Sequence, residues 1–184
     1  MKPNEPEESG VLERRIQEVT QANRKFYEAF ESLDIAKMDE VWAHLDYVTC
    51  VHPGWALRSE WPAVRDSWVL IFNNTFSMKF ELTESMIQVA GDMAWVICME
   101  NITSQQADEP QQTRVLATNL FERIGDEWLM IHHHGSPIMG CTTRGITSDR
   151  GVHAAGTARQ GKCNPRDGVD AGLTILMLVR LAPR

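Results

Sequence analysis

The sequence contains no long hydrophobic segment. Its longest apolar stretch, LTILMLV near the end, is far shorter than the roughly 20 residues that a membrane-spanning helix needs. The first ten residues, MKPNEPEESG, have neither the basic region nor the apolar region of a secretory signal. These two absences predict a soluble, cytoplasmic protein with no membrane partner.

Cysteine and positive charge are also scarce. The 184 residues include 4 cysteines, and no two of them form a C-x-x-C pair. A disulfide framework or a thiolate metal site is therefore not indicated. The chain has 18 Lys and Arg against 25 Asp and Glu, a formal charge of -7. Because phosphate backbones attract basic surfaces, nucleic acid is not the expected partner.

A periodic hydrophobic pattern is missing after residue 140. Residues 141–184 hold 7 Lys and Arg against 3 Asp and Glu and are rich in glycine. Neither a helical nor a strand period can be traced through them. We therefore expect a disordered N-terminus over residues 1–10, one domain over residues 11–138, and a poorly ordered Gly- and Arg-rich tail over residues 139–184.

The pattern that is present begins with three helices. From Leu12 to Leu33, apolar residues recur at steps of mostly three or four, which predicts one long amphipathic helix. Asp34 is placed to cap a second helix and Ser59 a third. A short polar side chain at such a position accepts hydrogen bonds from the free amides of the first helical turn.

Five later segments have the alternation and the turn boundaries of β-strands, at residues 47–52, 78–90, 93–103, 113–123 and 127–134. The central strands are apolar on both faces, as in AWVICMEN. A sheet of this kind needs cover on both sides. We expect the helices to cover one face and the second subunit of a homodimer to cover the other.

Four strings within residues 19–138 resemble one known family. They are ANRKFYEAFESLDIAKMDEVWA, YVTCVHPGW, ESMIQVAGDMAWVICMENI and ATNLFERIGDEWLMIHHHGSP, and they resemble the SnoaL-like group of NTF2-like proteins. The resemblance implies an α+β fold, the NTF2-like cone, in which three N-terminal helices pack on a curved antiparallel sheet. It leaves the activity open, because the superfamily includes isomerases, dehydratases, epoxide hydrolases, polyketide cyclases and non-enzymatic assembly domains.

Histidines supply the main candidate chemistry. Alternation in the last strand places His132 and His134 on the face of Trp128 and Met130, and His133 on the other face. The resemblance implies a ligand pocket on the concave face of the sheet, and we assign the Trp128 face to it. Two imidazoles at one cavity would serve as acid and base near neutral pH. The structural alternative is that they only hydrogen-bond to neighbouring strands.

Other polar and aromatic residues complete the predicted site. The Pro53-Gly54 turn presents its neighbours His52 and Trp55 at the mouth of the cavity. Asparagines inside apolar strands need a partner or a function. The predicted catalytic residues are His52, His132 and His134, and the predicted ligand-binding residues are Trp55, Asn101, Asn119, Trp128 and Met130.

A metal site is the weaker interpretation of the histidines. The set formed by His132, His134 and His52 would supply three nitrogens to zinc. The pattern is short, and members of the superfamily usually work without a metal, so we expect no metal or other cofactor. A carboxylate base is also not assigned, because Glu100 shares the parity of the small residues Ala94 and Cys98.

Two functions remain open at the level of the sequence. The first is a pocket for a small hydrophobic molecule, with histidine acid-base chemistry of the isomerase, dehydratase or cyclase type. The second is a dimerisation or assembly domain without turnover. A vacant cavity on the order of several hundred cubic ångströms, lined by Trp and His, would favour the first function, whereas a cone filled by side chains would favour the second.

Overall fold

A computed structural model describes residues 5–105 and 110–138. The elements follow in the order α1 (Glu5–Ser32), α2 (Ile35–Val41), β1 (Thr49–Val51), β2 (Arg58–Ser59), α3 (Trp61–Asn73), β3 (Ser77–Ala90), β4 (Met93–Gln105), β5 (Pro110–Ile124) and β6 (Glu127–Pro137). The α+β class predicted from the sequence is confirmed. The predicted tail, residues 139–184, lies outside the described residues. Within the described ranges, no helix is both long and apolar enough to cross a membrane.

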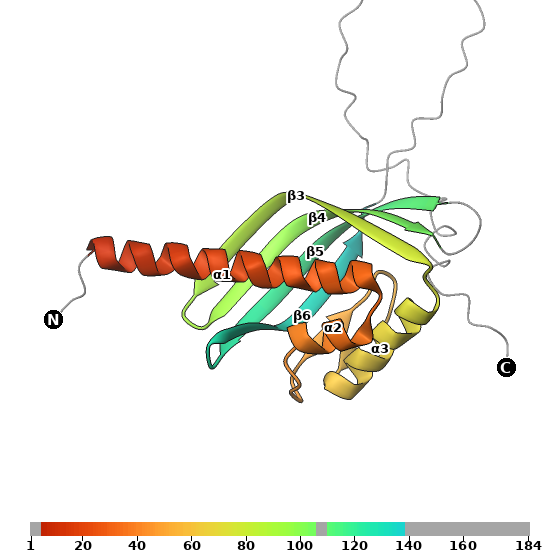
Figure 1. Ribbon diagram of the computed structural model, residues 1–184, viewed down its shortest axis with the longest axis horizontal. Coiled ribbons are helices and arrows are strands. Elements are labelled where there is room, and N and C mark those ends of the chain that lie inside the picture. Colours follow the sequence, from red (N-terminus) through yellow and green to blue (C-terminus); the bar gives the residue numbers. More distant parts are fainter. Residues whose placement is uncertain (1–4, 106–109, 139–184) are drawn as a thin grey trace, which may run out of the picture.

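The six strands form one sheet in the order β2-β1-β6-β5-β4-β3. Neighbouring strands are antiparallel except β1 and β6, which run parallel. The long strands β3 to β6 curve, α1 lies lengthwise across one face of them, and α2 and α3 pack at one end of that helix (Figure 1). We call the face under α1 the inner face and the opposite one the outer face.

The boundaries of the helices follow from local hydrogen bonding. Asp34 caps α2 as predicted, because its Oδ1 accepts a hydrogen bond from the amide of Ala36 at 2.9 Å. The prediction for Ser59 is wrong: it lies in β2, and α3 begins two residues later with Pro62 in its first turn. α1 begins at Glu5 and so includes residues 5–10, for which the sequence predicted no order.

Aromatic rings between the helices and the inner face form the centre of the core. The ring centroid of Trp68 on α3 lies 4.7 Å from that of Phe30 and 5.7 Å from that of Phe26, both on α1. On the inner face of β4, Ala94 and Cys98 are fully buried. These small side chains leave room for the large side chains of α1, such as Tyr27, whose hydroxyl lies 3.4 Å from Sγ of Cys98.

A β-bulge in β6 changes which side chains face the helices. Leu120 pairs with His132 and Phe121 pairs with Met130, so Ile131 has no partner on β5. One extra residue in a strand moves every later side chain to the other face. The strict alternation that we assumed for this strand therefore ends at Ile131.

The prediction that His132 and His134 share the face of Trp128 is consequently wrong. His133 is the histidine on the inner face, where it is 2% exposed. His132 and His134 lie on the outer face, the first half-buried and the second exposed. The imidazole that reaches the interior is thus the one that we had assigned to the opposite side.

These positions predict opposite effects for two neighbouring substitutions. His133→Ala removes a buried ring and leaves its hydrogen-bond partner unsatisfied, so the free energy of unfolding should fall by about 1 to 3 kcal/mol. His134→Ala should change it by less than about 0.5 kcal/mol, because that side chain is exposed. Chemical denaturation of the two variants measures both values. Equal losses would show that the bulge is misplaced.

Candidate functional site

A cavity lies between the inner face of the sheet and the helices α1 and α3. Its volume is about 50 Å³, which is room for a few water molecules or one very small organic molecule. Its walls are mostly apolar. The lining residues are Phe30, His52, Pro53, Trp55, Ile71, Met78, Glu100, Ile102, Ser104, Thr113, Val115 and His133. The cavity is thus smaller than a roomy ligand pocket but is not filled by side chains.

Glu100 supplies the only carboxyl group among these lining residues. It comes from β4 and is 2% exposed. Its Oε1 accepts a hydrogen bond of 2.7 Å from the hydroxyl of Tyr27 on α1. Burial raises the pKa of Glu100 to about 7, although the hydrogen bond from Tyr27 acts in the opposite direction. A carboxyl group with such a pKa both accepts and donates a proton near neutral pH.

His133 faces the same cavity from β6. Its Nδ1 lies 2.7 Å from Oδ1 of Asn119 on the neighbouring strand β5. Burial, followed by the nearby imidazole of His52, lowers the pKa of His133 well below its ordinary value. The ring is therefore uncharged at neutral pH and has one nitrogen with a free electron pair.

His52 is the second imidazole of the cavity. Its Nε2 lies 2.9 Å from Oγ of Ser67, and that hydroxyl donates its own proton to the carbonyl of Val64 at 2.6 Å. The Ser67 oxygen must therefore accept a hydrogen bond from the Nε2–H of His52. Burial, and secondarily the charge of Arg58, lowers the pKa of His52 to about 3. His52 is thus also a neutral ring.

A close contact between strands holds the turn that carries His52 and Trp55. Gly135 of β6 has no side chain, and a Cβ atom there would lie only 3.0 Å from Cγ of Pro53 and 3.1 Å from Cγ1 of Val115. The proline ring therefore packs directly on the strand. This contact fixes the start of the turn at the edge of the cavity.

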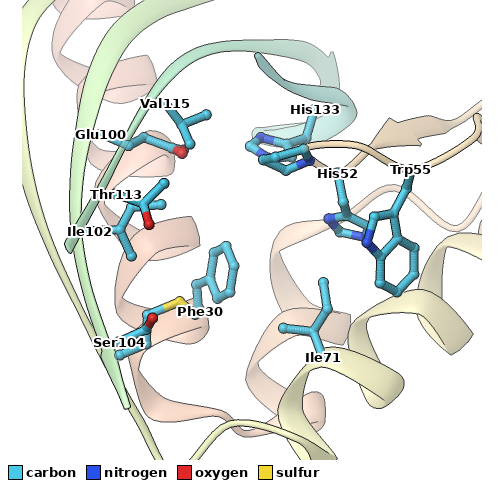
Figure 2. Close-up of a pocket in the computed structure, with 12 residues that line it drawn as sticks. Phe30, His52, Trp55, Ile71, Glu100, Ile102, Ser104, Thr113, Val115 and His133 are labelled. Carbon is cyan, nitrogen blue, oxygen red and sulfur yellow. The ribbon is translucent and has the colours of Figure 1, made fainter. Parts of the chain in front are cut away.

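The three ionisable groups lie across the cavity from one another. Figure 2 shows the carboxyl group of Glu100 on one wall and the imidazoles of His52 and His133 on the opposite one. None of the described lining residues is a lysine or an arginine. A ligand between the two walls would meet a carboxyl group that exchanges its proton and uncharged nitrogen acceptors. This arrangement suits proton transfer on an uncharged molecule.

Only part of the predicted site comes together at this cavity. His52 and Trp55 line it as predicted. Asn119 is buried behind His133 and contacts it, so it lies one layer outside the lining. Glu100, which alternation had placed away from the cavity, is on its wall. The signal that could have identified it is a single acidic residue in an otherwise apolar strand.

The remaining predicted ligand contacts lie elsewhere. Trp128 and Met130 are on the inner face but do not line the cavity, and Trp128 Nε1 donates a hydrogen bond to Glu18 at 3.1 Å. Asn101 lies on the outer face, where its amide donates to the carbonyl oxygen of Glu81 at 3.0 Å. The three residues therefore lie outside the cavity that His52 and Trp55 line.

The histidines do not assemble into the three-nitrogen set that zinc would need. His52 is on the inner face, whereas His132 and His134 are on the outer face. Across residues 5–105 and 110–138, no group of three or more His, Cys, Asp or Glu side chains is arranged to hold a metal ion.

The outer face carries a second feature, an apolar patch in which Met99 is buried whereas Trp95 and Leu116 are exposed. We define it by five residues on β4 and β5, where Trp95 pairs with Leu120, Met99 pairs with Leu116, and Ile97 lies between them. Trp95 is 36% exposed and Leu116 is 40% exposed. Exposed apolar patches on a sheet mark interaction surfaces.

Comparisons with known proteins agree with this architecture. A family model described as SnoaL-like domain matches residues 19–140. A solved structure from Streptomyces avermitilis, an NTF2-like protein with a provisionally assigned dehydratase function, is 36% identical. The match covers 70% of this chain and 99% of that one, with a TM-score of 0.66.

Two other relatives have names that differ from that of the dehydratase. A protein from Thiobacillus denitrificans, provisionally described as a calcium/calmodulin-dependent protein kinase type II association domain, is 31% identical. That match covers 64% of this chain and 93% of that one, with a TM-score of 0.56. The F-box protein SKIP8 of Arabidopsis thaliana is 28% identical over 121 residues, which are 66% of this chain.

This chain spans about half the length of the curated relative from Arabidopsis, 50% of it. The family match includes α1 from its middle onward, strands β1 to β6 and all residues that line the cavity. Fold, element order and the match to residues 19–140 lead to one conclusion. The chain belongs to the SnoaL-like family of the NTF2-like superfamily.

Proposed function

We propose that the cavity binds a small, uncharged organic molecule and catalyses proton transfer on it. The observation that supports this most is Glu100, a buried carboxyl group with a pKa of about 7 on the wall of an apolar cavity. Carboxyl groups are seldom buried unless they are paired, and perturbed pKa values gather at functional sites. NTF2-like domains commonly bind small molecules, which agrees with such a role.

Two groups on opposite walls of the cavity act as the acid and the base. Protonated Glu100 gives its proton to a carbonyl oxygen of the ligand while a neutral imidazole takes a proton from the adjacent carbon, which forms the enol, an imidazolium and the Glu100 carboxylate. His133 is the proposed acceptor, with His52 as the neighbouring ring. The imidazolium then returns a proton to carbon and the enol hydroxyl returns its proton to Glu100, so both groups regain their starting states and the cycle is balanced. This assignment replaces the earlier one to His132 and His134, which face the other way.

The lining also restricts the class of ligand. Without lysine or arginine among the described lining residues, a carboxylate ligand would have no counter-charge and would be repelled by ionised Glu100. A cavity of roughly 150 Å³ holds benzene, so a volume of about 50 Å³ limits the ligand to a few non-hydrogen atoms. Acetone, a ketone of four such atoms, therefore serves as a probe of the site.

Exchange of carbon-bound hydrogen tests the proposal without knowledge of the natural substrate. Acetone in D2O at pH 7 should exchange its α-hydrogens faster with the protein than in buffer, as followed by NMR. Glu100→Gln keeps the shape of the side chain but removes the proton exchange, so it should lower the protein-dependent rate at least about tenfold, within the usual range for general acid-base groups.

Glu81→Gln is the matched control, because it makes the same chemical change on an exposed side chain of β3. Its exchange rate should equal that of the unaltered protein. Binding of acetone without any protein-dependent exchange would leave a binding domain and exclude the catalytic role. If the protein neither binds acetone nor speeds its exchange, the alternative function is favoured, a dimerisation or assembly domain. The association-domain relative is the precedent for it.

The raised pKa of Glu100 also predicts how stability depends on pH. The folded protein holds the proton up to a pH of about 7, whereas the ordinary value is 4.5. The resulting stabilisation is complete below pH 4.5 and is lost as the pH rises through 7. Relative to Glu100→Gln, the protein should lose roughly 3 kcal/mol of unfolding free energy between pH 5 and pH 8. Denaturation of both proteins at the two pH values checks this, and a constant difference would contradict it.

We further propose that the apolar patch of the outer face joins two copies of the chain. NTF2-like domains commonly dimerise, and covering the patch would remove exposed Trp95 and Leu116 from water. The full chain should sediment as a dimer at micromolar concentration. Leu116→Glu should shift it toward monomer, because the new carboxylate would be buried without a partner.

Leu57→Glu serves as the control for association, because Leu57 is an exposed apolar side chain that precedes β2 and lies outside the patch. It should leave the sedimentation coefficient unchanged. An unaltered protein that sediments as a monomer would overturn the proposal for the outer face. It would not bear on the cavity, which lies on the other side of the sheet.

A further inference from the structure

Five polar side chains at the cavity and behind it form one connected network of hydrogen bonds. Asn119 is at its centre and is fully buried. Its amide nitrogen lies 2.8 Å from Oδ1 of Asn23 and 3.2 Å from the hydroxyl of Tyr27, and its Oδ1 lies 2.7 Å from Nδ1 of His133. Tyr27 continues the chain to Glu100.

The direction of these hydrogen bonds is set by the donors available. Tyr27 has a single proton, and it donates that proton to Glu100, so its oxygen accepts from Asn119. Burial and the nearby Glu100 keep the pKa of Tyr27 well above its ordinary value, so the phenol does not lose this proton. Oδ1 of Asn23 takes the second proton of the Asn119 amide.

With both amide protons engaged, Asn119 can offer only its carbonyl oxygen to His133. The Nδ1 of that ring must then carry the proton, because two acceptors facing each other at 2.7 Å would repel. The Nε2 of His133 is left with the free electron pair. Since Nδ1 is held on the strand β5 side, Nε2 is the nitrogen available to a molecule in the cavity.

We propose that Asn119 is a positioning residue that fixes His133 in the tautomer protonated at Nδ1, and so makes this ring a proton acceptor toward the cavity. The proposal rests on the proposed function for its catalytic meaning. An amide does not relay protons under these conditions, so Asn119 orients the site without taking part in the transfer. Its link to Tyr27 couples this orientation to the opposite wall, where Glu100 is the donor.

The tautomer is measured directly by long-range proton–nitrogen NMR correlation of the full chain at pH 7. The signals of His133 are assigned by their absence from the spectrum of His133→Gln. We expect one neutral tautomer with the proton on Nδ1. Asn119→Asp keeps an acceptor oxygen beside Nδ1 and should keep that proton there, whereas Asn119→Leu removes the acceptor and should give a mixture of tautomers or the Nε2-protonated one.

Asn101→Leu is the control, because it removes an asparagine of the same sheet from the outer face, and it should leave the His133 tautomer unchanged. If Asn119→Leu does not fold, Asn119→Ala provides the same loss of the acceptor with less crowding. A tautomer unchanged in the leucine or alanine variant would overturn the positioning role. So would an unaltered protein with the proton on Nε2.

The exchange of the α-hydrogens of acetone separates this proposal from the proposed function. Asn119→Leu or Asn119→Ala should lower the protein-dependent rate at least tenfold, and Asn119→Asp should retain more of it than either. A rate unchanged despite an altered tautomer would overturn the positioning role and leave the cavity chemistry intact. A fixed tautomer in a protein without any exchange would overturn the proposed function but confirm the hydrogen-bond assignment.

Discussion

The hydrogen bond from Tyr27 to Glu100 joins the first helix, the sheet and the cavity. It connects α1 to the middle of β4. It also gives the buried carboxyl group a partner, without which burial of the ionised form would cost roughly several kcal/mol. It also leaves one face of that carboxyl group to the cavity (Figure 2). The same contact thus fixes the helix on the sheet, satisfies the interior and presents a titrating group to a ligand.

The interior of the site is polar, yet it carries little charge. The two imidazoles are neutral because burial disfavours their cationic forms, and Glu100 retains its proton to an unusually high pH for the same reason. A single physical effect, removal from water, therefore produces both the acid and the base. Hydrogen bonds with Tyr27, Asn119 and Ser67 make this burial tolerable by satisfying the polar atoms that it removes from water.

Much of the fold follows from hydrophobic period and turn residues. The long first helix, the cap at Asp34 and the four-strand meander are visible in the sequence because each depends on neighbours within a few residues. The bulge at Ile131 is not visible in this way, since it depends on how β5 and β6 register against each other. That one residue decided whether His133 or its neighbours faced the cavity. The site could therefore be located on β6 from the sequence, whereas its histidine could not be identified.

The error on β4 has a different origin. On β4 the inner face carries small side chains, such as Ala94 and Cys98, because the aromatic side chains of α1 fill the space above them. The large residues are on the side that the helices leave open. For a sheet awaiting a second cover, residue size alone is a poor guide to which face is the inside.

The bulge also changes which residues of β6 face the helices. Up to Ile131 the even-numbered side chains face the helices, and beyond it the odd-numbered ones do. Tolerance to substitution along this strand should therefore alternate with a period of two and change phase once, at Ile131. A family member that lacks the bulge residue would present a different set of side chains to its cavity while keeping the same strands, so the ligand chemistry of this fold can change through a single insertion or deletion.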